Sequence, residues 1–120
     1  MSAGVSGRIR WEHTDRVTGT RLLFREVTIA PGGDTGWHYH QGLLVGKLVE
    51  GRLTHQERDH RHTYETGAVI VEWPGADKVH IGLNEGDVPL VLEVLYILPN
   101  GVPLAVEAPS PELRARVQQH

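Results

Sequence analysis

Short apolar runs alternate with turn-forming residues along the whole of this chain. Glycine and proline, which number 14 and 7, interrupt the sequence at regular intervals. The runs between them are rich in Val, Leu, Ile, Thr and Tyr, residues typical of strands. The pattern predicts eight short strands, at residues 8–13, 20–30, 37–40, 43–49, 52–57, 68–72, 79–83 and 90–98.

The segments between these runs support the strand boundaries. They contain residues that preset or tolerate the backbone angles of tight turns, and they lie at 31–34, 50–51, 74–75, 84–87 and 99–101. One helix is expected, over residues 111–119, where Ser110 can cap it, Pro111 suits its first position and Glu112 favours the positive end of its dipole. Together these elements predict an all-β sandwich or barrel that forms one domain over residues 1–120.

Charge and composition exclude several classes of partner. The 12 Lys and Arg residues are scattered and are outnumbered by 15 Asp and Glu, so nucleic acid and anionic membranes are not expected as partners. No stretch approaches the roughly 18 apolar residues of a membrane span, and no apolar segment suggests a signal peptide. We therefore expect a cytoplasmic protein. Because cysteine is absent, disulfides and thiolate metal sites are excluded.

Histidine is the unusual component of this sequence, with eight residues, several of them clustered. His38 and His40 lie two residues apart in the predicted strand 37–40, so their rings project from the same face and can chelate one ion. The alternative is that both are ordinary polar residues on a solvated face. A third histidine, His80, lies in another predicted strand and favours the metal site.

The spacing around these histidines resembles two motifs of the cupin superfamily. The first motif, G-x5-H-x-H-x(3,4)-E-x6-G, matches this chain at every spacing and at every residue but one, through Gly32, His38, His40, Leu44 and Gly51. The residue that differs is Leu44, which replaces the glutamate. The second motif, G-x5-P-x-G-x2-H-x3-N, is altered in its loop length, since four residues separate the segment 74–75 from His80. Both motifs lie within about residues 32–84.

The resemblance implies an antiparallel jelly-roll barrel of about eight strands with one divalent transition metal bound by His38, His40 and His80. Neutral imidazole ligands suit Fe, Zn and Ni and tolerate Mn, and three protein ligands leave positions open for water or substrate. Three neutral ligands leave the ion its full charge, so a carboxylate or enolate would be a favoured substrate group. The family includes dioxygenases, isomerases and cyclases, and the motif does not separate them.

The sequence also suggests where a missing carboxylate could come from. If residues 50–51 form a two-residue hairpin turn, Leu44 lies opposite Glu57 and Gly46 lies opposite His55. Either Glu57 or His55 would then face the interior as a fourth ligand or a general base. The alternative is that both are solvated strand residues, because a slip of one residue in register turns them outward.

Other candidate residues carry weaker signals. His60 and His62 also have the two-residue spacing, but they lie in a charged stretch that reads as an exposed hairpin tip. Aromatic residues in strands usually pack in a core or an interface. Trp73, beside the altered loop, and Tyr96, in the last predicted strand, are candidates for the wall of a substrate pocket.

These observations favour a metal-dependent enzyme that acts on a small organic molecule with a carbonyl, carboxylate or enolisable group. Dioxygenase, isomerase and cyclase activities stay open, because fold does not fix function. The alternative is a noncatalytic cupin module that binds a small ligand, with a structural metal or none. A purely structural or interaction protein leaves the histidine spacing unexplained.

A homodimer is expected from the family resemblance. The predicted strand 8–13 carries Ile9 and Trp11 at alternate positions, which would place both on one face. This strand would offer an unpaired edge that a second chain could cover.

Overall fold

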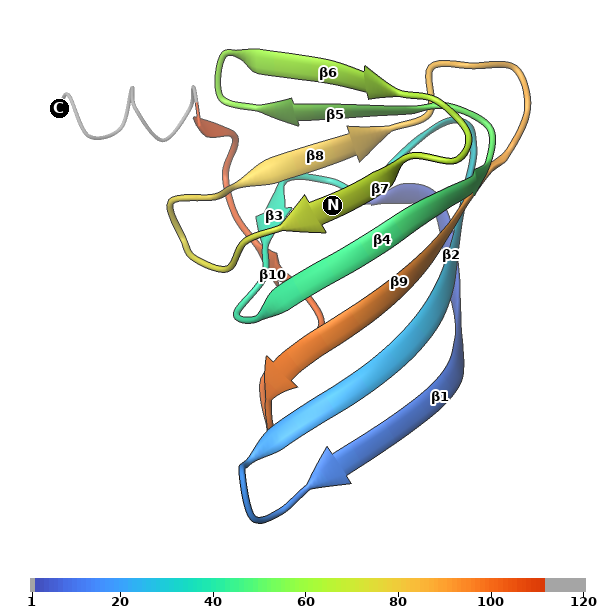
Figure 1. Ribbon diagram of the computed structural model, residues 1–120. Helices are drawn as coiled ribbons and strands as arrows, with labels where there is room; N and C mark the ends of the chain where they lie inside the picture. The colour runs from blue at the N-terminus through green and yellow to red at the C-terminus, as the bar shows by residue number, and fades with distance from the viewer. Residues whose placement is uncertain (1, 112–120) are drawn as a thin grey trace, which may run out of the picture.

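The computed structural model describes residues 2–111, which form ten strands that pair with one another in antiparallel fashion (Figure 1). The strands are β1 (Ala3–Asp15), β2 (Thr20–Asp34), β3 (His38–Tyr39), β4 (Leu43–Glu50), β5 (Leu53–Glu57), β6 (His60–Tyr64), β7 (Val69–Glu72), β8 (His80–Leu83), β9 (Leu90–Pro99) and β10 (Val106–Glu107). The predicted all-β, antiparallel fold class is therefore confirmed. The helix predicted over 111–119 lies, from residue 112 on, outside the described residues.

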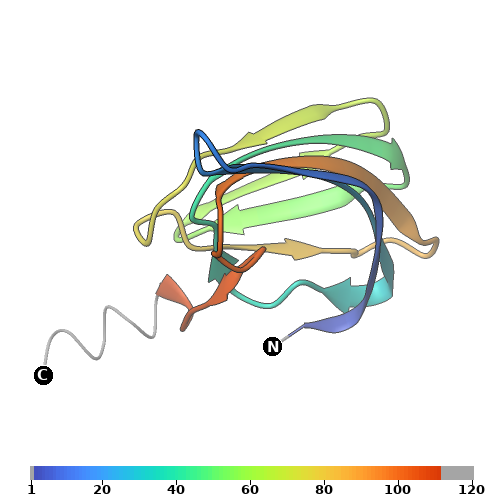
Figure 2. The same ribbon diagram turned by 90° about the horizontal axis from the view of Figure 1, so that it is seen from below.

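The strands form one curled sheet that makes a half-barrel. Strands β1, β2, β9, β4 and β7 lie side by side in that order, and β10, β3, β8, β5 and β6 continue the sheet beyond the end of β2. The link is the bridge between Asp34, the last residue of β2, and Leu83 of β8. Figure 2 shows how this brings the two groups of strands to face each other.

Two strands were not predicted from the sequence. β10 contains only two residues, which is too short for a pattern to register. β6 includes His60 and His62, which were expected at a hairpin tip, but the tip lies at residues 58–59 and both histidines belong to the strand. They are exposed, as expected. An exposed strand of charged and polar residues has no apolar alternation to distinguish it from a loop.

The predicted hairpin between β4 and β5 is wrong. β4 pairs with β9 and β7, whereas β5 pairs with β6 and β8. β9 and β7 occupy the two edges of β4, so β5 cannot pair with it. Gly51, where the chain leaves β4, has a φ of 78° and lies so close to the backbone of Leu90 that a Cβ would come within 2.9 Å of it. Only glycine accepts this conformation and approach easily, and the chain leaves β4 for the opposite side of the half-barrel. Leu44 therefore lies opposite Glu72 and Tyr96, and Glu57 lies opposite His80.

The predicted arrangement of Ile9 and Trp11 on one face is also wrong. A shift of register between them places Ile9 opposite Arg25 and Trp11 opposite Phe24. Arg25 and Phe24 are consecutive residues of β2, whose side chains point to opposite faces. The bulge in β1 thus turns Trp11 to the face away from the interior.

The core lies on the concave side of the half-barrel. Its fully buried aliphatic side chains come from β2, β4 and β9, and they are Leu23, Ile29, Leu48, Leu90 and Leu98. Each such side chain stabilises the fold by about 1.5–3 kcal/mol relative to leaving it in water. No helix among residues 2–111 is long and apolar enough to cross a membrane. The cytoplasmic location stays a prediction.

Asn84 joins the end of β2 to the loop between β8 and β9. Its side chain is 2% exposed, and its Nδ2 donates hydrogen bonds to the carbonyl oxygens of Ile29, at 2.9 Å, and Val88, at 2.8 Å. Its Oδ1 accepts a hydrogen bond from the Gly86 amide at 3.0 Å. The asparagine of the second sequence motif therefore has a structural role, since it satisfies three backbone groups at one point.

We predict that Asn84→Ala lowers the free energy of unfolding by about 2–4 kcal/mol, because the buried carbonyl of Ile29 and the backbone groups of Gly86 and Val88 lose their partner. Urea denaturation of the variant and the wild type measures the difference. Asn100→Ala, at an exposed turn, is the matched control and should change stability little. Equal stability of the Asn84 variant and the wild type would contradict the structural role.

Candidate metal centre

Three histidines predicted as metal ligands come together at one end of the interior. His38 on β3 lies directly opposite His80 on β8, and His40 follows β3 by one residue. Their ring centroids are separated by 4.8 Å for His38 and His40, 4.3 Å for His38 and His80, and 5.2 Å for His40 and His80. The two-residue spacing of His38 and His40 and the cross-strand pair of His38 with His80 produce this cluster.

A fourth residue, Glu72, completes the cluster and was not predicted as a site residue. Its Oε2 lies 2.9 Å from Nε2 of His40 and 2.9 Å from Nε2 of His80. One ligand atom from each of the four residues lies within 4.8 Å of all the others. The available signal was the alternation of β7, since Glu72 shares a face with buried Ile70.

Each of the three histidines is oriented by a hydrogen bond at Nδ1 to a backbone carbonyl oxygen. The pairs are His38 with Gly36 at 2.7 Å, His40 with Leu104 at 2.7 Å and His80 with Lys78 at 2.9 Å. A carbonyl oxygen can only accept, so Nδ1 carries the proton in each ring. In the neutral imidazole this leaves a lone pair on Nε2, the atom that faces Glu72.

The centre of the cluster therefore collects acceptors and no donor. Nε2 of His80 and Oε2 of Glu72 are buried, and neither has a hydrogen-bond partner among residues 2–111. A lone pair and a carboxylate oxygen at 2.9 Å repel each other unless a cation lies between them. The donor set of three imidazoles and one carboxylate fits a divalent transition metal, so these residues suit the ion implied by the resemblance.

The pKa shifts describe the cluster when a proton, and not a metal ion, lies between the histidine nitrogens and Glu72. Burial opposes the charged form of Glu72, but its hydrogen bonds and charge interactions with His40 and His80 outweigh burial and hold the pKa of Glu72 well below 4.5. Burial likewise opposes protonation of His80, but Glu72 raises its pKa above 6.5. Burial, with the nearby His80, lowers the pKa of His38 to about 4. His38 is thus neutral at pH 7, and metal binding would displace the proton shared by His80 and Glu72.

The residues predicted as a fourth ligand or general base lie beside this cluster. His55 on β5 is buried, its ring stacks on His80 at 4.9 Å, and its Nε2 lies 3.8 Å from Oε1 of Glu72. Burial lowers the pKa of His55, so the ring is neutral. Glu57 is half-buried and lies opposite His80. Neither side chain lines the cavity described next. Their catalytic roles stay predictions.

A cavity of about 300 Å³ opens onto the metal cluster. His38, His40 and Glu72 form one part of its wall, and Arg25 and Tyr96 form another. The remaining wall is largely aliphatic and includes Val27, Leu44, Leu53, Ile70, Leu92, Val94 and Leu104. Tyr96 lines this cavity, and its role in substrate binding stays a prediction. Trp73 is 64% exposed and does not line this cavity, and its role in substrate binding stays a prediction.

Solved structures with the same fold include proteins of different kinds. A cupin domain from Bordetella pertussis Tohama I has a TM-score of 0.63 and 23% identity, over 78% of this chain and 93% of that one. The polyketide cyclase RemF from Streptomyces resistomycificus has a TM-score of 0.69 and 17% identity, over 99% and 81%. The cupin domain of an XRE family transcriptional regulator from Enterobacter cloacae has a TM-score of 0.61 and 15% identity, over 80% and 97%.

At these identities the likeness establishes the fold and not the activity. No curated protein matches the sequence. The family model for the cupin domain matches residues 25–98, which is more than half of the chain and includes all four residues of the metal cluster. The protein therefore belongs to the cupin domain family.

Proposed function

We propose that this cupin is a metal-dependent enzyme that acts on a small organic molecule with a carbonyl, carboxylate or enol group. The observation that carries the proposal is the convergence of three Nε2 lone pairs and a buried carboxylate at the wall of a cavity of about 300 Å³. That volume lies at the lower end of the range for small-molecule sites. A ligand in the cavity would be in contact with His38, His40 and Glu72.

A bound Fe, Zn, Ni or Mn ion would supply Lewis-acid polarisation of a substrate oxygen, or oxygen activation in the case of iron. The chain itself supplies the remaining requirements. The carbonyl oxygens hold the three rings in one tautomer, and Glu72 neutralises part of the charge of a divalent ion. The Tyr96 hydroxyl stays protonated at neutral pH, because burial raises its pKa, and it can donate a hydrogen bond.

Glu72 supplies the carboxylate that the glutamate of the first family motif would supply, since that position is Leu44 in this chain. Leu44 occupies the motif position on β4, and Glu72 is its direct partner on β7. Directly opposed residues of antiparallel strands have Cβ atoms about 4.5–5.5 Å apart, so a carboxylate on either residue reaches the same space. We infer that the carboxylate ligand has moved to the neighbouring strand. The proposed ligand set thus has one negative charge and differs from the three neutral histidines predicted from the sequence.

Metal content is the first test of the proposal. We predict about one equivalent of Fe, Zn, Ni or Mn per chain in untagged protein purified without chelator, and loss of that metal in His38→Ala. The double variant His60→Ala/His62→Ala is the matched control, because its two histidines have the same spacing but lie exposed on β6. Elemental analysis makes the measurement.

The identity of the metal would also divide the reaction classes. Iron would favour a dioxygenase, and zinc, nickel or manganese would favour an isomerase or a cyclase. Wild-type protein without metal, even after incubation with each of these ions, would contradict the proposal and favour the noncatalytic binding module. Glu57→Ala with unchanged metal content and activity would exclude Glu57 as a ligand or base.

A carboxylate exchange tests the role of Glu72. We predict that Glu72→Leu weakens metal binding by more than the roughly 10- to 100-fold typical of losing an outer-shell partner. The double variant Leu44→Glu/Glu72→Leu should recover most of the affinity, because the carboxylate returns from the opposite strand. Competition with a fluorescent chelator measures both constants. Full affinity in Glu72→Leu alone would show that Glu72 is no ligand.

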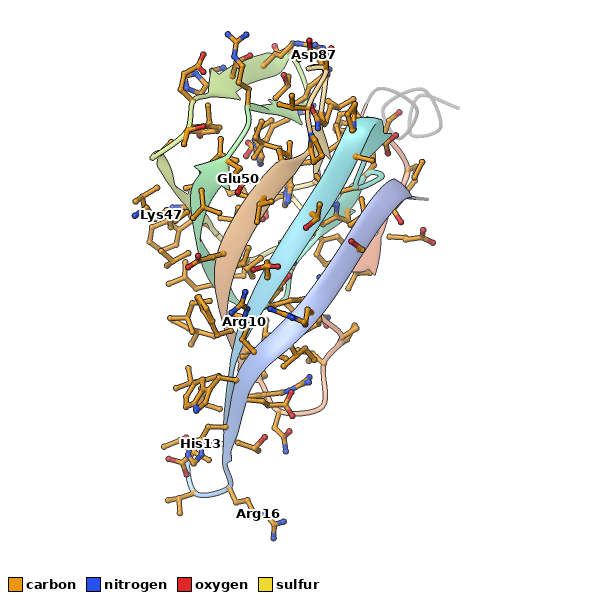
Figure 3. All side chains as sticks on the ribbon, turned by 90° about the vertical axis from the view of Figure 1, so that its right-hand side faces the viewer. Arg10, His13, Arg16, Lys47, Glu50 and Asp87 are labelled. Atoms are coloured by element: carbon orange, nitrogen blue, oxygen red, sulfur yellow. The ribbon has the colours of Figure 1, made fainter. Side chains whose placement is uncertain are left out.

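We also propose that the protein forms a homodimer through the outer face of the sheet. One row of directly opposed side chains crosses five strands on this face, and all of them are apolar: Trp11, Phe24, Leu95, Val45 and Val71. Trp11 is 51% exposed and Val71 is 47% exposed. β1, which contributes Trp11 to this row, is an edge strand and pairs only with β2 among the described strands. Arg10 and His13 mark β1 in Figure 3. A second copy could cover both the row and the edge.

We predict that Trp11→Glu converts the dimer into a monomer, because a charge in the buried row would lose its hydration. Light scattering after gel filtration measures the mass. Val17→Glu is the matched control, since Val17 is 95% exposed in the turn after β1 and lies away from the row. A wild-type mass equal to one chain would contradict the dimer.

A further inference from the structure

Arg25 is a cationic residue at an inward-facing position of β2. Its neighbours on the same face, Leu23 and Val27, are buried core residues, and Arg25 itself lines the cavity. A guanidinium on the interior face of a half-barrel loses part of its hydration and needs a partner in return. Because a partly dehydrated charge lowers the stability of the fold, an arginine at this position points to a function.

Among the described residues, the Arg25 guanidinium is engaged by a single hydrogen bond. Its Nη1 donates one hydrogen bond to the Tyr96 hydroxyl at 3.2 Å. Within residues 2–111 no carboxylate forms an ion pair with Arg25. The carboxylates that line the cavity are Glu72, in the metal cluster, and Glu107 on β10. A guanidinium has several N–H donors in a planar fork, and this fork matches the two oxygens of a carboxylate.

Gly7 on the adjacent strand β1 provides the space that the guanidinium occupies. A Cβ built on Gly7 would overlap Nη2, Cζ and Nε of Arg25. Gly7 does not have a positive φ, so its backbone would accept alanine. The absence of a side chain at this position is therefore explained by the Arg25 head group rather than by backbone geometry.

Tyr96 connects Arg25 with the metal cluster. Its hydroxyl accepts the hydrogen bond from Arg25, and its ring lies edge-on to His40 with 6.3 Å between the centroids. Tyr96 and Glu72 are both direct partners of Leu44, so the three residues form one row across β9, β4 and β7. The cavity thus has a cationic group at one part of its wall and the metal ligands at another, with one tyrosine between them.

We propose that Arg25 binds the carboxylate of the substrate and that Tyr96 is a positioning residue for Arg25. The ligand class is a small monocarboxylic acid whose second oxygen, a carbonyl or hydroxyl, reaches the metal cluster. Arg25 offers one positive charge at its part of the wall, which matches a monoanion, whereas a phosphate dianion would keep an uncompensated charge beside the carboxylates of Glu72 and Glu107. The metal end of this arrangement rests on the proposed function, but the carboxylate end rests on Arg25, Tyr96 and Gly7 alone.

Calorimetry with matched acids and amides tests the carboxylate end. The probes are benzoate, 2-hydroxybenzoate and 4-oxopentanoate, each compared with its primary amide, which has nearly the same shape but no charge. We expect the acids to bind wild-type protein about 10- to 100-fold more tightly than the amides, as a charge-assisted hydrogen bond implies. Arg25→Gln should abolish this preference, and Tyr96→Phe should reduce it.

Gly7→Ala tests the same site without removing the charge. The new Cβ should displace the flexible end of Arg25 and lower the affinity for the acids while leaving that for the amides unchanged. Ser6→Ala, at the neighbouring exposed position of β1, is the matched control and should have no effect. Thermal melting of each variant verifies that the fold is intact.

The experiment is run on metal-loaded protein and on protein treated with EDTA, so that the two proposals fail separately. A preference for acids that depends on Arg25 and persists after EDTA treatment supports the inference, even if no metal is bound in the purified protein. The inference is overturned if no acid binds at millimolar concentration, or if the preference for acids survives in Arg25→Gln. Neither of these results bears on the metal content.

Discussion

The candidate site depends on three hydrogen bonds from histidine Nδ1 to backbone carbonyl oxygens. They fix the tautomer of His38, His40 and His80 and turn each Nε2 lone pair toward the same point. The partner of His40, the Leu104 carbonyl, comes from the segment before β10, far along the chain from β3. Without a cation at the point of convergence, buried acceptors would face one another at contact distance. The fold therefore holds an arrangement that a metal ion or a proton must complete.

The sequence predicted the histidine cluster because that cluster depends on local spacing and on a recognisable motif. His38 and His40 share a face through the period of two in a strand, and His80 lies at the motif position in another strand. Glu72 could not be found in this way, since its place depends on which strand lies beside β4. A tight hairpin at residues 50–51 would place β5 beside β4, but the two edges of β4 are occupied by β9 and β7.

Whether a feature leaves a pattern of apolar residues in the sequence also explains which other parts of the fold were predicted. Strands with an apolar face, such as β2 and β9, were predicted within a few residues of their bounds. The solvent-facing β6 gave no pattern, and the two-residue β10 was too short to give one. The bulge in β1 reversed the relation between Ile9 and Trp11, because one extra residue exchanges the two faces of a strand and leaves no mark in composition.

The opposition of Leu44 and Glu72 has a consequence for how such sites can change over time. A chain with carboxylates at both positions would always hold one near the histidines, so the ligand could pass from β4 to β7 through two single substitutions. No intermediate in that path would lack the acidic group. The position of a ligand in space can thus persist while its position in the chain changes. The spacing of motif residues alone would then assign the wrong ligand set to the changed protein.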